Sequence, residues 1–181
     1  MITRTNNKRG KDSGFTVVEM ALATTMLMVG IMAISAATLR MHQLGRQNRE
    51  RTIAHNAMTQ MGERLNSASA IAALTPTTWA DTVIDAYSEG GTVGNLFSVT
   101  GLSPIDGEAE PGNIVFITDE TLTDADLGVD MGMPRDLNGD GDMTDTDVTN
   151  SVELLPAIIT ISWAVRGADM SIRHPLFLMG Y

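Results

Sequence analysis

Residues 14–39 read GFTVVEMALATTMLMVGIMAISAATL, a long apolar stretch that contains a single carboxylate. From Met20 to Leu39 there are 20 residues without a charge, which as a helix span about 30 Å, the thickness of a bilayer core. One carboxylate, Glu19, stands inside the apolar part, where an ionised group is costly unless it has a partner or a route to water. The stretch predicts a membrane helix, but a simple anchor leaves Glu19 unexplained.

The helical pattern continues beyond Arg40, where it becomes amphipathic. Apolar residues recur at three- and four-residue spacing at Ala54, Ala57, Met58, Met61, Leu65, Ala68 and Ala72. No proline occurs between residues 15 and 74, and Pro76 predicts the end of the helix. We therefore expect one long helix over residues 15–73. Its part 15–39 would lie in a membrane or filament core, and its part 40–73 would pack one apolar stripe on the remainder.

Residues 74–181 are rich in glycine and turn residues, with short apolar runs between them. NIVFIT (113–118) predicts a strand, and AIITISWAV (157–165) alternates in the period-two pattern of a half-buried strand. Residues 170–181 can return as its partner, and Pro175 favours an edge position or a bulge. The sequence thus predicts an α+β fold, with a small antiparallel sheet of three to five strands on the C-terminal half of the helix.

Charge is distributed unevenly along this 181-residue chain of net charge −10. Residues 1–14 carry four basic residues against one aspartate, whereas residues 65–181 carry three arginines against 18 acidic residues. A basic start and an acidic remainder predict that the N-terminus stays cytoplasmic while the rest is translocated. The acidic head argues against a nucleic-acid partner. The absence of cysteine excludes a disulfide framework and a thiolate metal site.

Three interpretations compete for a basic leader followed by an apolar helix. A secretory signal peptide would have a shorter apolar core, and a plain uncleaved anchor leaves Glu19 unexplained. The third is a family resemblance. GFTVVE at 14–19 resembles the processing motif of type IV pilins and of the pseudopilins of type II secretion, with Gly14, Phe15 and, at the fifth position after the cut, Glu19.

This resemblance implies that residues 1–14 are a leader that prepilin peptidase removes between Gly14 and Phe15, after which the new N-terminus is methylated. It also implies an assembly role for Glu19, which would neutralise the N-terminal amine of a neighbouring subunit; pairing lowers the cost of both charges in a low-dielectric site. The expected partners are other pilins and minor pilins, bound through the N-terminal helix. The expected location is the inner membrane as a single-pass protein, then an extracellular pilus or a periplasmic pseudopilus.

Within this superfamily the chain most resembles PilV-type minor pilins, which implies a structural role in priming or modifying a pilus. The resemblance lies in VVEMALATTMLMVGIMAISA (17–36), AHNAMTQMGERLNSASA (54–70) and the hairpin ITISWAVRGADMSI (159–172). Minor pseudopilins of the GspI kind are similar and remain the alternative. Major pilins usually carry a helix-breaking proline where this chain has Ala36 and Ala37, and often a C-terminal disulfide; neither feature carries over.

The second sharp motif is DLNGDGDMTDTD (136–147), whose spacing is that of an EF-hand calcium loop. The candidate ligands are Asp136, Asn138, Asp140, Asp142 through its carbonyl, Thr144 and Asp147, at positions one, three, five, seven, nine and twelve. Gly141 falls at the sharp turn, and Met143 is expected to point inward. The loop resembles the dockerin variant, which ends in aspartate. It predicts Ca²⁺ as a structural clip; a solvated acidic loop is the alternative.

Signals for catalysis are weak. The three histidines are scattered, and no serine elbow, zinc-binding histidine pair or glycine-rich phosphate loop occurs. A further acidic segment, TDETLTDAD (118–126), is interpreted as a solvated loop rather than a carboxylate pair for hydrolysis. We therefore expect a protein that is not an enzyme. A membrane-anchored calcium-binding enzyme or adhesin is the alternative from a different class.

Overall fold

The computed structural model describes residues 15–74, 79–165 and 168–180. The predicted leader, with Gly14, and residues 166–167 of the predicted hairpin turn lie outside these ranges. The chain divides into two units, one up to Arg46 and one from Gln47 onward. A single helix, α1 (Val17–Ala72), contributes to both units, and it agrees with the helix predicted over 15–73.

The first unit contains the apolar part of α1. All of its described side chains are exposed, including large apolar residues such as Val17, Leu27 and Ile34. This is the one helix within the described residues that is long and apolar enough to cross a membrane. Two threonines, Thr24 and Thr25, lie in the charge-free part of α1 that follows Glu19. Their hydroxyls donate to backbone carbonyls three and four residues earlier. Their polar groups are therefore satisfied within the helix.

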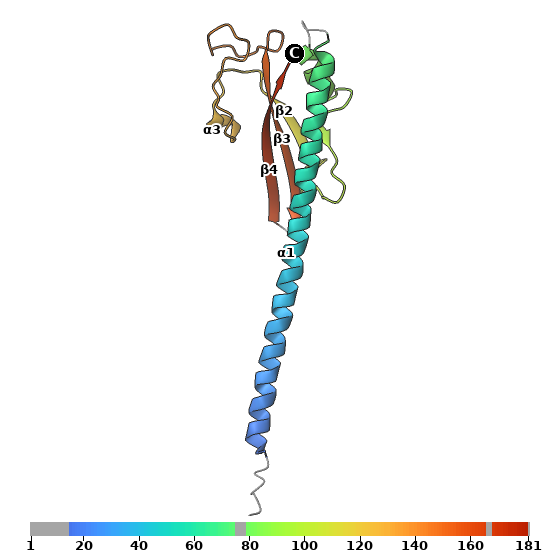
Figure 1. The fold of residues 1–181 in the computed structure, drawn as a ribbon, viewed down its shortest axis with the longest axis vertical. Coiled ribbons are helices and arrows are strands. Elements are labelled where there is room, and N and C mark those ends of the chain that lie inside the picture. Colours follow the sequence, from blue (N-terminus) through green and yellow to red (C-terminus); the bar gives the residue numbers. More distant parts are fainter. Residues whose placement is uncertain (1–14, 75–78, 166–167, 181) are drawn as a thin grey trace, which may run out of the picture. The chain divides into compact units, whose positions relative to one another are not determined.

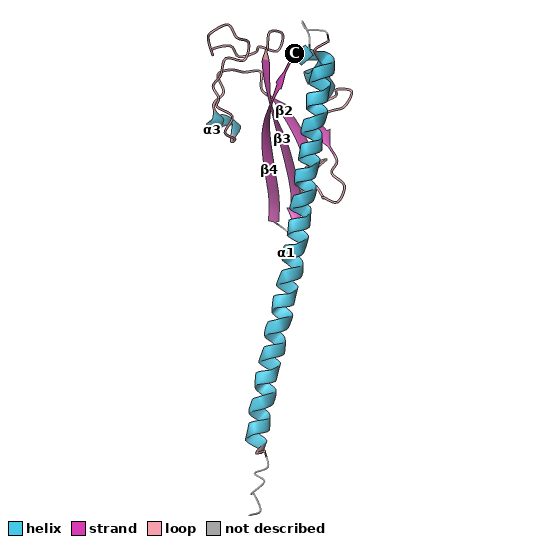
Figure 2. Ribbon diagram, viewed as in Figure 1, coloured by secondary structure: helices cyan, strands magenta, loops and turns pink. Residues whose placement is uncertain are grey.

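The second unit is an α+β domain built on the remaining part of α1. It contains a short helix, α2 (Trp79–Tyr87), and four strands: β1 (Leu96–Phe97), β2 (Gly112–Phe116), β3 (Leu154–Val165) and β4 (Ala168–Met179). The strands form one antiparallel sheet in the order β1-β2-β3-β4. The predicted α+β layout with a sheet of three to five strands is therefore confirmed (Figures 1 and 2).

The sheet packs on α1 through a stripe of helix residues at three- and four-residue spacing. Buried on this face of α1 are Ala54, Met58, Met61, Leu65, Ser69 and Ala72. From β3, the side chains of Ile159, Ile161 and Trp163 join the same core, and Figure 1 shows β2, β3 and β4 beside this part of the helix. The hydroxyl of Ser69 donates to the Met179 carbonyl at 2.9 Å. The amphipathic pattern of the sequence thus predicted the packing face.

The position of Pro175 in β4 agrees with the edge position expected for the last strand. β3 pairs with β4 over its full length, with Ile158 opposite Pro175 and Ile161 opposite Ile172. β4 is the outermost strand, so Pro175, which has no N–H to donate, removes no bond from a further neighbour.

A long excursion between β2 and β3, residues 117–153, carries both acidic motifs. Figure 2 shows it as loops with one short helix, α3 (Asp124–Leu127). It joins the core through Met131, Met133, Leu137, Val148 and Val152. Backbone bonds close it on itself, since Val148 N donates to Thr118 O at 3.0 Å and Glu153 N to Leu137 O at 2.8 Å. Backbone hydrogen bonds near its two ends and a few buried apolar side chains therefore hold the excursion on the head.

Candidate functional site

The predicted calcium loop, residues 136–147, is wound by hydrogen bonds from its own side chains. The Asp136 carboxylate accepts the Gly139 N–H at 2.6 Å and the Gly141 N–H at 2.9 Å. Asn138 Oδ1 accepts the Asp140 N–H at 3.0 Å. Gly141 has φ +96°, a backbone conformation that favours glycine, at the position where the motif requires a sharp turn.

The second half of the loop uses its carboxylates differently from the expected ligand pattern. Asp142 Oδ1 accepts both the N–H and the hydroxyl of Thr144 at 2.9 Å, and the N–H bond is the main cause that lowers the pKa of Asp142. Asp147 Oδ1 accepts the Thr149 hydroxyl at 2.6 Å and the Thr149 N–H at 3.1 Å, which lowers the pKa of Asp147. The Asp147 carboxylate is therefore directed at Thr149.

Met143, expected to point inward from position eight, is 49% exposed. This expectation was wrong, and Leu137 supplies the loop's buried apolar side chain instead. The physical reason is that no helix flanks the loop to cover position eight, whereas Leu137 lies over the core of the head.

Glu120 lies in the acidic segment that was interpreted as a solvated loop, and for this residue the interpretation was wrong. Its side chain is 0% exposed. Glu120 Oε1 accepts the Leu137 N–H at 2.6 Å and the Asn138 N–H at 3.2 Å, and its own N–H donates to Asp145 O at 2.9 Å. Glu120 Oε2 is buried and has no hydrogen-bond partner among the described residues.

These contacts bring three carboxylates together. One oxygen each from Glu120, Asp142 and Asp145 lies within 4.8 Å of the others. Asp142 is among the predicted ligands, but through its backbone carbonyl and not its carboxylate, whereas Glu120 and Asp145 are not among them. Asp145 falls at position ten of the loop, which is no ligand position of the motif, and Glu120 precedes the loop by 16 residues. No spacing in the sequence connects Glu120 with the loop, so only the fold could reveal it.

The other acidic residues of 118–126 have structural partners. Asp124 accepts the backbone N–H groups of Met133, Met131 and Gly132 at 2.9 to 3.0 Å, and these bonds, with that of Met133 first, lower the pKa of Asp124. Asp126 forms a capping box with Thr123 at the start of α3. These two carboxylates hold the backbone of the excursion.

The start of α1 has a capping box as well. Glu19 Oε2 accepts the N–H of Thr16 at 2.9 Å and its hydroxyl at 3.0 Å, and Glu19 N donates to Thr16 Oγ1 at 3.3 Å. Phe15 is 79% exposed. Glu19 therefore has a local role as the helix cap, and both of these bonds to its carboxylate go to Oε2.

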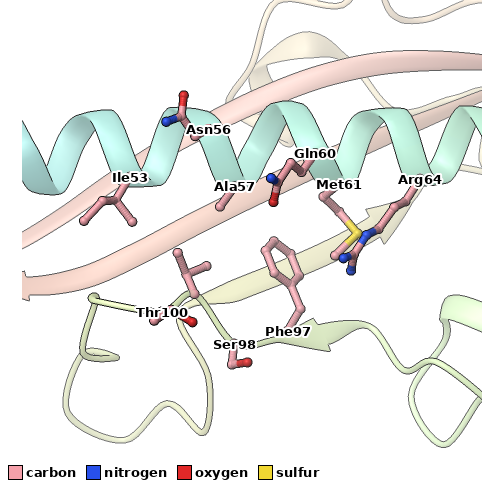
Figure 3. A pocket seen from close by; sticks show the side chains of 10 residues that line it. Ile53, Asn56, Ala57, Gln60, Met61, Arg64, Phe97, Ser98 and Thr100 are labelled. Atoms are coloured by element: carbon pink, nitrogen blue, oxygen red, sulfur yellow. The ribbon is translucent and has the colours of Figure 1, made fainter.

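A groove of about 480 Å³ lies between α1 and the segment around β1 (Figure 3). The ring of Phe97 points toward the helix, beside Met61 and Ala57. Among the residues that line this groove, Arg64 alone is charged. The groove thus lacks the paired titratable groups that acid–base or nucleophilic catalysis requires.

Comparison of the chain with protein-family models, with curated proteins and with solved structures gives no match.

Proposed function

We propose that the chain is a structural subunit of a type IV pilus, most like a PilV-type minor pilin, and that it is not an enzyme. The observation that carries the proposal is Glu19. It stands at the fifth position after the Gly14–Phe15 junction, in the first turn of a helix whose next 20 residues carry no charge. The α+β layout, with a head packed on the C-terminal part of α1, supports the same proposal.

The proposed assembly uses the exposed apolar surface of α1. Before assembly, this surface would lie in the inner membrane, with the N-terminus cytoplasmic. In the filament it would contact the helices of neighbouring pilins, so that assembly moves the helix from lipid into a protein core of similar polarity. Cleavage by prepilin peptidase creates an amine on Phe15, and a neighbour's Glu19 would neutralise it and set the register of the incoming subunit.

The capping box does not compete with this role. Glu19 caps the helix through Oε2, so Oε1 can accept a hydrogen bond from a second group at the same time. A free anchor would need the cap alone, whereas a filament subunit would use both oxygens. The cap also fixes the carboxylate at the helix start, where a neighbour's N-terminus would meet it.

The second candidate is a minor pseudopilin of type II secretion, similar to the GspI kind, which would share this processing and helix-mediated assembly. No feature of the described head favours one machine over the other. A tethered enzyme is less supported, because the groove beside α1 lacks paired titratable groups among its lining residues.

The deciding experiment is intact mass and N-terminal sequencing of the protein from membranes and from sheared surface filaments. We expect a chain that begins at Phe15 and carries a methylated amine. A Gly14→Val variant should keep its leader, whereas Gly10→Val, which changes another leader glycine, should be processed normally. A wild-type chain that retains residues 1–14 would refute the pilin proposal.

A further inference from the structure

We propose that the head binds one Ca²⁺ ion between Glu120 and the 136–147 loop, with Glu120, Asp142 and Asp145 as its carboxylate ligands. This proposal differs from a loop that wraps a cation by its own residues alone, because the deepest ligand comes from outside the loop. It goes beyond the filament role and does not rest on it.

The first argument is the buried oxygen of Glu120. A carboxylate removed from water loses its hydration, and an oxygen without a partner then costs free energy that the fold must offset. Glu120 is 0% exposed and Oε2 has no hydrogen-bond partner among the described residues. One oxygen of the same carboxyl group lies within 4.8 Å of one oxygen each of Asp142 and Asp145, so the buried carboxylate adjoins two further anionic ligands.

The second argument is that hydrogen bonds attach Glu120 to residues near the beginning and near the end of the 136–147 loop. Through Oε1, Glu120 binds the N–H groups of Leu137 and Asn138, which begin the loop, and through its own N–H it binds the carbonyl of Asp145. Asn138 Nδ2 donates in turn to Asp145 Oδ2 at 3.1 Å. Four hydrogen bonds therefore fix the positions of two ligands before any ion arrives, which lowers the ordering cost of binding.

The third argument is charge. Three carboxylates within 4.8 Å repel one another, and Asp136 and Asp140 lie in the same short loop. Arg135, which directly precedes the loop, has its guanidinium 5.3 Å from the ring centroid of Phe177. A divalent cation at the point where the three carboxylates meet would remove this repulsion.

The donor set favours Ca²⁺ over other metals. Each of the three ligands offers a hard carboxylate oxygen, which suits Ca²⁺ or Mg²⁺, whereas Zn²⁺ in proteins is bound mainly by histidine and cysteine. Ca²⁺ binds oxygens at about 2.3 to 2.6 Å, so opposite ligands lie about 4.6 to 5.2 Å apart. Oxygens within 4.8 Å of one another fit one such sphere. Mg²⁺ demands a smaller and more regular site and loses its water reluctantly.

The ligand roles also differ from those predicted by the motif. Asp136 and Asn138 shape the loop by accepting backbone N–H groups. Asp147, the expected terminal ligand, is directed at Thr149. The bound ion would therefore act as a clip that joins residue 120 to residues 142–145 and stabilises the excursion between β2 and β3.

The test uses the full-length chain in detergent, with CaCl₂ or EGTA as the only variable. Binding to the folded state alone raises the unfolding midpoint as calcium increases, by about 3 °C for each tenfold excess over Kd in a chain of this size. Direct titration calorimetry with CaCl₂ gives Kd. We expect Glu120→Gln and Asp145→Asn to weaken binding by about tenfold or more, because affinity depends on the number of charged ligands.

Asp147→Asn is the matched control, since it makes the same chemical change two residues from Asp145 and should leave Kd within about twofold. Asp145 is partly exposed, so its variant keeps the test valid if Glu120→Gln fails to fold. No midpoint shift in the wild type, or a loss of binding in Asp147→Asn with none in Asp145→Asn and Glu120→Gln, would overturn the proposal. Equal affinity for MgCl₂ would overturn the choice of Ca²⁺.

Discussion

At the scale of single residues, the carboxylates of this chain differ in what surrounds them. Asp124 and Asp126 bind backbone N–H groups at the surface, and Glu19 caps a helix. Glu120 is buried, and one of its oxygens has no hydrogen-bond partner in the part of the chain that the structure describes. The sequence shows the same functional group in each case. Its role depends on which N–H groups and which other carboxylates lie within reach.

Glu19 offers a way to separate helix capping from assembly. Glu19→Gln removes the charge but keeps a side chain that can complete the capping box with Thr16, whereas Thr16→Ala removes the cap and keeps the charge. We expect Glu19→Gln to stay inserted in membranes but to be strongly depleted from sheared filaments, measured by immunoblot. Thr16→Ala should be incorporated nearly as well as the wild type. Loss of both, or of neither, would contradict the charge-pairing role.

Asp124 predicts a dependence of stability on pH. The N–H groups of Met133, Met131 and Gly132 favour its charged form, so its pKa in the folded chain lies below its value in the unfolded chain, about 3.9. The stabilisation is therefore fully present above that value and is lost as pH falls through the lower, folded pKa. Asp124→Asn should be less stable than the wild type at pH 7, and the difference should shrink below about pH 4.

The measurement is the urea midpoint of both chains from about pH 7 to pH 3. Asp85→Asn, which removes an exposed carboxylate from α2, controls for the loss of one negative charge. A constant difference between Asp124→Asn and the wild type across this range would show that the carboxylate acts only through packing.

At the scale of secondary-structure elements, α1 is one helix with two different surfaces. Its first part is apolar and exposed all round, which suits lipid or neighbouring helices, and its second part buries one stripe under the sheet. The change follows from the sequence, where Arg40 is the first charged residue after Glu19 and charged and polar residues are then interspersed with apolar ones. Helix and stripe were therefore both predictable from periodicity.

Leu65 and Ile71 test the stripe on the same helix. Leu65 is 0% exposed in the core, so Leu65→Ala should lower the free energy of unfolding by about 2 to 5 kcal/mol through lost burial and a cavity. Ile71 is 69% exposed, and Ile71→Ala should change it by no more than about 0.5 kcal/mol. Urea unfolding followed by tryptophan fluorescence measures both. Similar losses in the two variants would contradict the packing face described for α1.

At the scale of the whole molecule, the charges are distributed unevenly along the chain, and the part of α1 between Glu19 and Arg40 carries none. The acidic residues gather in the head, and many of them lie in the excursion between β2 and β3, where short side-chain bonds and an apolar base hold the backbone. The excursion brings Glu120 beside Asp142 and Asp145, residues more than 20 positions away. A cation bound there would connect the two ends of a segment that has little regular structure.

The sequence by itself determined the long helix, its packing stripe, the main strands and the sharp turn at Gly141 in the 136–147 loop. These features depend on local periodicity and on neighbours a few residues apart, such as Asp136 and Gly141, so they can be predicted from spacing. Only the tertiary structure decided that Glu120, Asp142 and Asp145 lie together. Glu120 meets Asp145 because β2 and β3 pair and return the chain on itself, and no local pattern encodes which surface carboxylate becomes buried by that return.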